Sequence, residues 1–176
     1  MTPRLRKFAL TVHVTSSVGW LGAVAGFLAL AIAGLTSQDA QMVRAAYLAM
    51  DLTTWVVIVP LAFASLLTGL VQSLGTPWGL FRYYWVLVKL LISVLATSVS
   101  LLQTGSISYL AGVAAETTLS STDLREARIS LVLHSGVGLL VLLVPMTLSV
   151  FKPRGRTRYG WRKHHEQLNR VNRTGG

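Results

Sequence analysis

The chain has 176 residues, enough for one domain, and combines 52% hydrophobic residues with only 12% charged ones, a composition that excludes an ordinary soluble protein. Its formal net charge is +10, but eight of the sixteen Lys and Arg residues lie between Lys152 and Arg173, a distribution typical of a membrane flank rather than of nucleic-acid binding. The chain has no cysteine, which excludes a disulfide, a thiol nucleophile and a thiolate metal site.

Four apolar stretches follow one another along the chain, each bounded by polar or turn residues. A membrane-spanning helix needs about 20 mainly apolar residues to cross roughly 30 Å of hydrocarbon. The stretches are too long, and too little alternating, for barrel strands. We therefore predict an all-α, integral membrane four-helix bundle with up-down-up-down topology over residues 1–151, followed by a basic cytoplasmic tail over residues 152–176. The expected spans cover residues 8–34, 52–74, 84–103 and 129–151.

The first stretch follows a short basic run and contains Ala31-Ile32-Ala33, as a secretory signal with a cleavage site does. The apolar region of a signal peptide has about 7–15 residues, whereas this run has roughly 25. We expect an uncleaved first span.

The third connection, residues 105–128, is long and is expected to lie outside the membrane. Residues 109–113 are expected to form a short interfacial helix there. The run from Ser120 to Asp123 is typical of a helix N-cap, from which the fourth helix is expected to begin beyond the bilayer. Glycines among the cations of the C-terminal tail predict a mobile or surface-lying segment.

Charges near the span ends predict the orientation, because Lys and Arg are retained on the cytoplasmic side. The N-terminus, the loop over residues 75–83 and the tail hold most of the cations, while the other two connections hold only Arg44, Arg125 and Arg128. All acidic residues except Glu166 fall on the other side. We predict an N-in, C-in, multi-pass protein of the bacterial cytoplasmic membrane.

Three ionisable side chains lie at membrane depth, where a charge is costly unless it is paired, hydrated or ligated. His13 and Lys89 lie near the cytoplasmic ends of their spans, and His134 lies near the outer end of the fourth. His13 shares a helical face with Ser17 and Trp20, so its imidazole is expected to point inward with the indole. The simpler alternative is a histidine satisfied by a serine or a backbone carbonyl within the bundle.

Lys89 begins a polar stripe on the third span. Its members, spaced three or four residues apart, are Ser93, Thr97, Ser100 and Thr104. We expect this stripe to face the bundle. Alternatively, Lys89 extends to the cytoplasmic headgroups and the hydroxyls bond to backbone carbonyls of their own helix.

Neutral histidine is a ligand for haem iron, copper or zinc, and methionine can complete a haem site. His13 and His134 are the candidate metal ligands, but they lie near opposite surfaces and are expected to be roughly 15–20 Å apart along the membrane normal at 1.5 Å per residue. They are therefore not expected to share one iron. Met146 lies near the level of His13, and Met50 near that of His134, although methionines in apolar helices usually only pack.

Two segments carry a resemblance to known families. The segment from His13 to Gly22, HVTSSVGWLG, and the segment from Arg82 to Leu90, RYYWVLVKL, resemble a motif pair of small bacterial membrane proteins. These are the copper-resistance protein D family, the HemJ-type protoporphyrinogen oxidases and a related four-helix family of unknown function, which the chain length and basic tail fit best. The resemblance implies that His13 and Lys89 form a cytoplasm-side site, linked to haem b in the porphyrin-handling relatives. It does not extend to porphyrinogen oxidation itself.

We therefore expect a membrane haem-binding or redox-associated protein, with His13 as an axial ligand of haem b, Trp20 and Met146 beside it, and Lys89 pairing with a propionate. One alternative is a small transporter or metal-handling protein, whose polar path would need a homo-oligomer because four helices make a narrow bundle. Copper is disfavoured, because the chain has no cysteine and only four methionines.

The other alternative is a non-enzymatic assembly subunit whose basic tail binds anionic lipid or a cytoplasmic protein. The same tail also follows simply from the preference for positive charge on the inside. No motif of a hydrolytic enzyme is present in the sequence.

Overall fold

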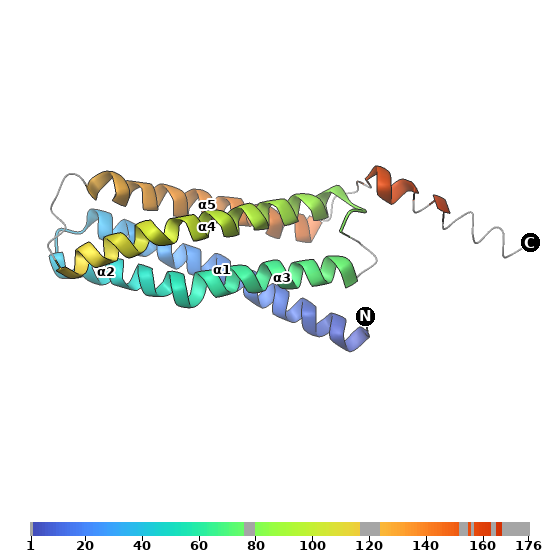
Figure 1. Ribbon diagram of the computed structural model, residues 1–176, viewed down its shortest axis with the longest axis horizontal. Coiled ribbons are helices and arrows are strands. Elements are labelled where there is room, and N and C mark those ends of the chain that lie inside the picture. Colours follow the sequence, from blue (N-terminus) through green and yellow to red (C-terminus); the bar gives the residue numbers. More distant parts are fainter. Residues whose placement is uncertain are drawn as a thin grey trace, which may run out of the picture.

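The computed structural model describes residues 2–75, 80–116, 124–151, 155, 157–162 and 165–166. Its elements follow the order α1 (Pro3–Thr36), α2 (Ala40–Thr53), η1 (Thr54–Ile58), α3 (Val59–Gly75), α4 (Tyr84–Glu116) and α5 (Arg125–Phe151). Because α2, η1 and α3 follow one another without a break, they form one rod, and the molecule is an elongated bundle of four long helices (Figure 1). The expected all-α bundle is confirmed.

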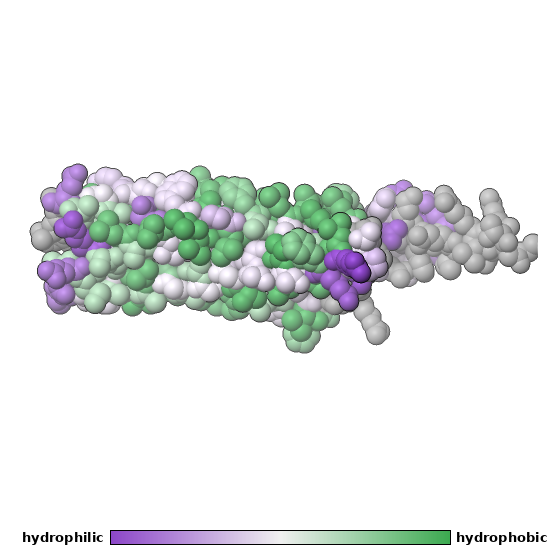
Figure 2. Space-filling model, turned by 90° about the horizontal axis from the view of Figure 1, so that it is seen from below, coloured by the Kyte–Doolittle hydropathy of each residue, from purple (hydrophilic) through white to green (hydrophobic). Residues whose placement is uncertain are grey.

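Four rods make up the bundle: α1, the second rod formed by α2, η1 and α3, then α4 and α5. Each of them is long and apolar enough to cross a membrane. Large aliphatic side chains also cover the outside of the bundle, as Leu102 does with 82% of its surface exposed. Hydrophilic residues gather at the two ends of the face that Figure 2 shows, with a mostly apolar belt between them. This surface is compatible with contact to lipid.

The helices extend beyond the spans expected from hydropathy. The second rod begins at Ala40 rather than near residue 52, so the first connection shrinks to residues 37–39. The prediction of a separate interfacial helix over residues 109–113 is wrong, because α4 continues without interruption to Glu116. Buried Ile107, Leu110 and Ala114 hold this extension against the core. The predicted N-cap run Ser120–Asp123 lies outside the described residues, and α5 begins at Arg125.

The second rod contains a π-helical stretch, which the hydropathy pattern does not predict. The backbone N–H of Val59 donates to the carbonyl of Thr54, five residues earlier. Pro60 follows directly; it has no N–H to donate, and its ring crowds the carbonyl one turn earlier. Such bulges widen a helix locally and often occur at functional sites. This one turns Thr54 and Ile58 toward the middle of the bundle, where both are buried.

The buried core lies mainly in the half of the bundle that contains the α1–α2 and α4–α5 connections. Tyr47, Met50 and Leu110 are almost completely inaccessible there. Arg128 of α5 ties this end together: its Nε donates to the Tyr47 hydroxyl at 3.0 Å, and its Nη2 donates to the Gly34 carbonyl. That carbonyl belongs to the last turn of α1, where helical acceptors have no partner within the helix and a cation is favoured.

The other end holds the first turn of α1, the α3–α4 connection and the last turn of α5 (Figure 1). Part of the tail docks here, which favours the surface-lying alternative of the expectation over the mobile one for the described residues. Thr157 donates its backbone N–H to the Arg82 carbonyl at 3.0 Å and its hydroxyl to the Phe81 carbonyl. Gly160 packs so closely on the Arg82 carbonyl that a Cβ there would clash. The described start of the tail is therefore part of the fold.

Candidate functional site

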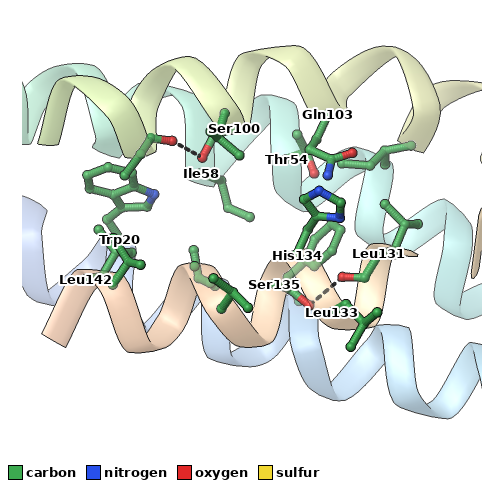
Figure 3. Close-up of a pocket in the computed structure, with 18 of the residues that line it drawn as sticks. Trp20, Thr54, Ile58, Ser100, Gln103, Leu131, Leu133, His134, Ser135 and Leu142 are labelled. Atoms are coloured by element: carbon green, nitrogen blue, oxygen red, sulfur yellow. Dashed lines mark hydrogen bonds between the residues drawn. The ribbon is translucent and has the colours of Figure 1, made fainter. Parts of the chain in front are cut away.

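A cavity of about 440 Å³ lies inside the bundle, bordered by α1, the second rod, α4 and α5 (Figure 3). Its volume is within the range typical of small-molecule sites. Among the described residues that line it none is charged, and most of its wall is aliphatic or aromatic. The lining residues are Trp20, Val24, Phe27, Thr54, Ile58, Leu95, Ala96, Val99, Ser100, Gln103, Ile107, Leu131, Leu133, His134, Ser135, Val137, Gly138, Val141 and Leu142.

Trp20 forms one end of the cavity. Its side chain is only 2% exposed, yet its Nε1–H has no hydrogen-bond partner among the described residues. In Figure 3 the indole nitrogen points toward the middle of the cavity. A buried N–H that forms no hydrogen bond costs about 1–3 kcal/mol, so each such group in a native structure requires an explanation. Trp20 is thus a buried donor at the cavity wall that lacks an acceptor among the described residues.

His134 forms the opposite end, with Gln103 and Thr54 beside it (Figure 3). Its Nδ1 lies 2.7 Å from the Ser130 carbonyl oxygen. A carbonyl can only accept, so this contact places the ring proton on Nδ1 and leaves a lone pair on Nε2. The imidazole at the cavity end therefore offers an acceptor or a ligand atom.

The cavity opens sideways, between α4 and α5. Leu95 and Val99 on α4, and Leu133 and Val137 on α5, line the cavity and are themselves exposed. A lining residue that is also exposed marks a place where the cavity reaches the outer surface. Since this part of the surface is the apolar belt, an occupant would enter from the side of the bundle rather than from its polar ends.

The hydroxyl groups in the cavity wall are already satisfied as donors. Thr54 bonds to the Met50 carbonyl at 2.7 Å, Ser100 to that of Ala96 at 2.9 Å, and Ser135 to that of Leu131 at 2.7 Å. Each bond stays within its own helix. Among the described lining residues, Trp20 is the one whose donor is fully buried and lacks an acceptor.

His13 lies elsewhere, at the interface of α1 with α3. Its Nδ1 is 3.1 Å from both the Ser65 carbonyl and the Thr68 hydroxyl. Gly69 lies so close that a Cβ there would be 3.0 Å from the imidazole Cε1. The expected inward direction is confirmed, and Ser17 follows the same face, since its hydroxyl is 2.7 Å from that of Ser65. The contacts are those of a satisfied bundle histidine.

Lys89 acts electrostatically on His13, but no contact between the two side chains is among the described ones. Its Nζ donates to the Ser149 hydroxyl at 2.6 Å and lies 5.8 Å from the centre of the Trp85 ring. The rest of the expected stripe faces inward in part: Thr97 is buried and Ser100 lines the cavity. Because these hydroxyls bond to carbonyls of their own helix, the stripe does not form a continuous polar path.

The two methionines and the two histidines are not brought together by the described contacts. Met146 is 46% exposed on the outside of α5, whereas His13 packs on α3. Met50 is fully buried in the core, while His134 lies at the cavity end. Within the described ranges, no group of three or more His, Asp or Glu side chains is placed to hold a metal ion.

Sequence reasoning missed a polar contact between the second rod and α4. Ser108 donates its hydroxyl to the Asp51 carboxylate at 2.6 Å and accepts from the Trp55 indole N–H at 3.4 Å. The sequence alone marks Asp51 only as one of the acidic residues expected on the outer side. A possible sequence signal is the i, i+4 pair of Asp51 and Trp55, one polar and one aromatic, on a single face of the second rod.

Comparison with known proteins adds no name to this site: no family model matches the chain, and neither the curated proteins nor the solved structures contain a match. The resemblance in the segments around His13 and Lys89 therefore stays a prediction.

Proposed function

We propose that this chain is a multi-pass protein of the bacterial cytoplasmic membrane that binds a small, largely apolar molecule between its four helices, in a redox-associated role. The observation that carries the proposal is the uncharged cavity with a buried, unpartnered Trp20 N–H at one end and a sideways opening to the apolar surface. A charged molecule is disfavoured, because burying a charge without a partner is very costly.

The orientation belongs to the same proposal. The even number of rods puts the start of α1 and the end of α5 at one end of the bundle (Figure 1), and the basic flanks favour a cytoplasmic location for that end. The basic tail is then placed to meet anionic lipid.

Cysteine labelling tests the orientation cleanly, because the chain has no cysteine of its own. In intact cells, a membrane-impermeant maleimide should label Gln38→Cys in the α1–α2 connection. It should label Phe81→Cys, an exposed residue beside α4, only after permeabilisation. The reverse pattern would overturn the orientation.

Two glycines of α5 provide a matched test of binding. A Cβ would meet nothing within 4 Å at Gly138, which lines the cavity, or at Gly136, which does not. Gly138→Phe should fill the cavity, whereas Gly136→Phe should leave it open. We expect decylbenzene, measured by calorimetry in detergent, to bind wild type and Gly136→Phe alike and Gly138→Phe at least tenfold more weakly. Absence of binding to wild type, or equal binding by all three proteins, would contradict the proposal.

Haem b at His13 is the second candidate, and one observation favours it. The Nδ1–Ser65 carbonyl contact orients the His13 imidazole with its Nε2 lone pair free, which is the arrangement of iron-ligating histidines. Lys89, whose charge acts on His13, would be the partner of a propionate. The cavity itself fits haem poorly, since its uncharged lining offers no partner for two propionates.

A reduced-minus-oxidised visible spectrum of protein purified from haem-replete cells tests this candidate. A Soret band lost in His13→Ala and retained in His134→Ala supports a haem at His13. A featureless spectrum rules it out for the protein as purified.

A further inference from the structure

We infer that the occupant of the cavity is a membrane-dissolved quinone, held by a hydrogen bond from Trp20 Nε1–H to one of its carbonyl oxygens. This inference rests on the proposed function and names the class of molecule. Three features of the cavity select the class: the buried Trp20 donor that lacks an acceptor among the described residues, the absence of charge among the described lining residues, and the direction of the opening.

The donor selects a molecule with an acceptor on a ring or at its end. The other donors near Trp20 are committed, since the hydroxyls of Ser100 and Ser135 bond to their own helices (Figure 3). A pure hydrocarbon would leave the indole N–H unsatisfied, at a cost of about 1–3 kcal/mol. A carbonyl oxygen placed within hydrogen-bond distance of Trp20 Nε1 removes that cost.

The uncharged lining disfavours, as occupants of the cavity, the other abundant membrane molecules that carry carbonyl groups. Fatty acids and phospholipids carry carboxylate or phosphate groups, and no Lys or Arg is among the lining residues to pair with them. A quinone is a neutral ring whose carbonyls accept hydrogen bonds, and the Trp20 ring in the wall suits a flat aromatic neighbour.

The opening provides a path for an isoprenoid tail. The exposed lining residues Val99 and Val137 flank the gap between α4 and α5. A ring lodged against Trp20 can therefore extend its tail sideways along an aliphatic wall into the lipid. Trp20 packs near Leu142, two turns along α5 from His134 and so roughly 12 Å away at 1.5 Å per residue. One ring does not reach both ends, which assigns the carbonyl contact to Trp20.

The test compares two probes with the same ten-carbon tail: decylubiquinone, which has ring carbonyls, and decylbenzene, which has none. The variants are Trp20→Phe, which keeps the aromatic ring and removes the N–H, and Trp55→Phe as the matched control. Trp55 is exposed and does not line the cavity. Binding is measured by calorimetry in detergent.

We expect Trp20→Phe to bind the quinone roughly five- to tenfold more weakly than wild type, the loss expected for one hydrogen bond. Trp55→Phe should bind it as wild type does, and all three proteins should bind decylbenzene equally. Unchanged quinone affinity in Trp20→Phe overturns the inference. Decylbenzene binding without quinone binding also overturns it but leaves the proposed function standing, whereas binding of neither probe removes both.

A second measurement does not depend on the variant folding. In ¹⁵N-labelled wild type, one of the five indole N–H resonances should move downfield with decylubiquinone and stay in place with decylbenzene. No such movement at saturating quinone contradicts the inference.

Discussion

Two histidines of the same bundle lie in opposite kinds of surroundings. His13 packs at the α1–α3 interface, where the Ser65 carbonyl and the Thr68 hydroxyl satisfy its Nδ1 and Gly69 lies close to its Cε1. His134 borders an open cavity together with a tryptophan whose N–H lacks a partner among the described residues. Both are ionisable residues at similar depths from their own surfaces. The comparison teaches that packing around an intramembrane histidine, rather than its presence, separates a structural role from a binding role.

The largest difference in stability is expected when a phenylalanine replaces a glycine in each of the two regions, one beside His13 and one in the cavity wall. Gly69→Phe must displace the His13 imidazole, and overpacking of this kind typically costs about 1–3 kcal/mol. Gly138→Phe meets open space and should stay within about 0.5 kcal/mol of wild type. Thermal unfolding followed by circular dichroism in one detergent measures both. Equal losses of stability in the two variants would contradict the distinction between the closed His13 interface and the open cavity.

Removal of each imidazole should give a difference of similar size in the same direction. His13→Ala loses two hydrogen-bond contacts and their packing, which we expect to cost about 1–3 kcal/mol. His134→Ala removes an exposed side chain bonded only to the preceding turn, and we expect a change below about 0.5 kcal/mol. The same unfolding assay applies, with the two variants as controls for each other. A larger loss in His134→Ala would reverse the assignment of roles.

The next effect is a coupling energy between serines. Ser17 and Ser65 bond to each other across α1 and α3, so a double-mutant cycle with alanine should give about 0.5–1 kcal/mol of coupling. Ser100 and Ser135 both line the cavity but bond within their own helices. Their cycle should give a coupling near zero. Similar couplings in both cycles would show that the cavity wall is as tightly linked as the His13 interface.

The smallest effect concerns the wall of the cavity. Since the Ser100 hydroxyl donates to Ala96, Ser100→Ala should change the affinity for decylubiquinone by less than about twofold, a fraction of one hydrogen bond. Calorimetry with the wild type as reference measures this. A tenfold loss would mean that Ser100, rather than Trp20, is the principal contact.

The sequence predicts the region around His13 better than it predicts the cavity. Apolar length alone predicts four helices, because the requirement to cross hydrocarbon is set by composition. The 3.6-residue period also predicts that His13 and Ser17 share an inward face. The satisfied state of His13 was one of the two alternatives that this pattern left open.

The cavity could not be predicted, because it depends on contacts between distant segments. Trp20, Thr54 and His134 come together from three rods, and no local period relates them. The π-helical stretch that turns Thr54 inward has only Pro60 as a sequence signal. The extension of α4 was missed for a related reason: Gly105 and Ser106 are typical of a loop, but packing of the following turns against the core overrides that local preference.

The most direct test of the account is the chemical identity of what the protein carries from its own membrane. Wild type, Gly138→Phe and Gly136→Phe are purified from the same cells, extracted with organic solvent and compared by mass spectrometry. We predict one neutral apolar species, a quinone, enriched in wild type and Gly136→Phe and lost from Gly138→Phe. Identical extracts from all three proteins, with no species that depends on an open cavity, would contradict the account.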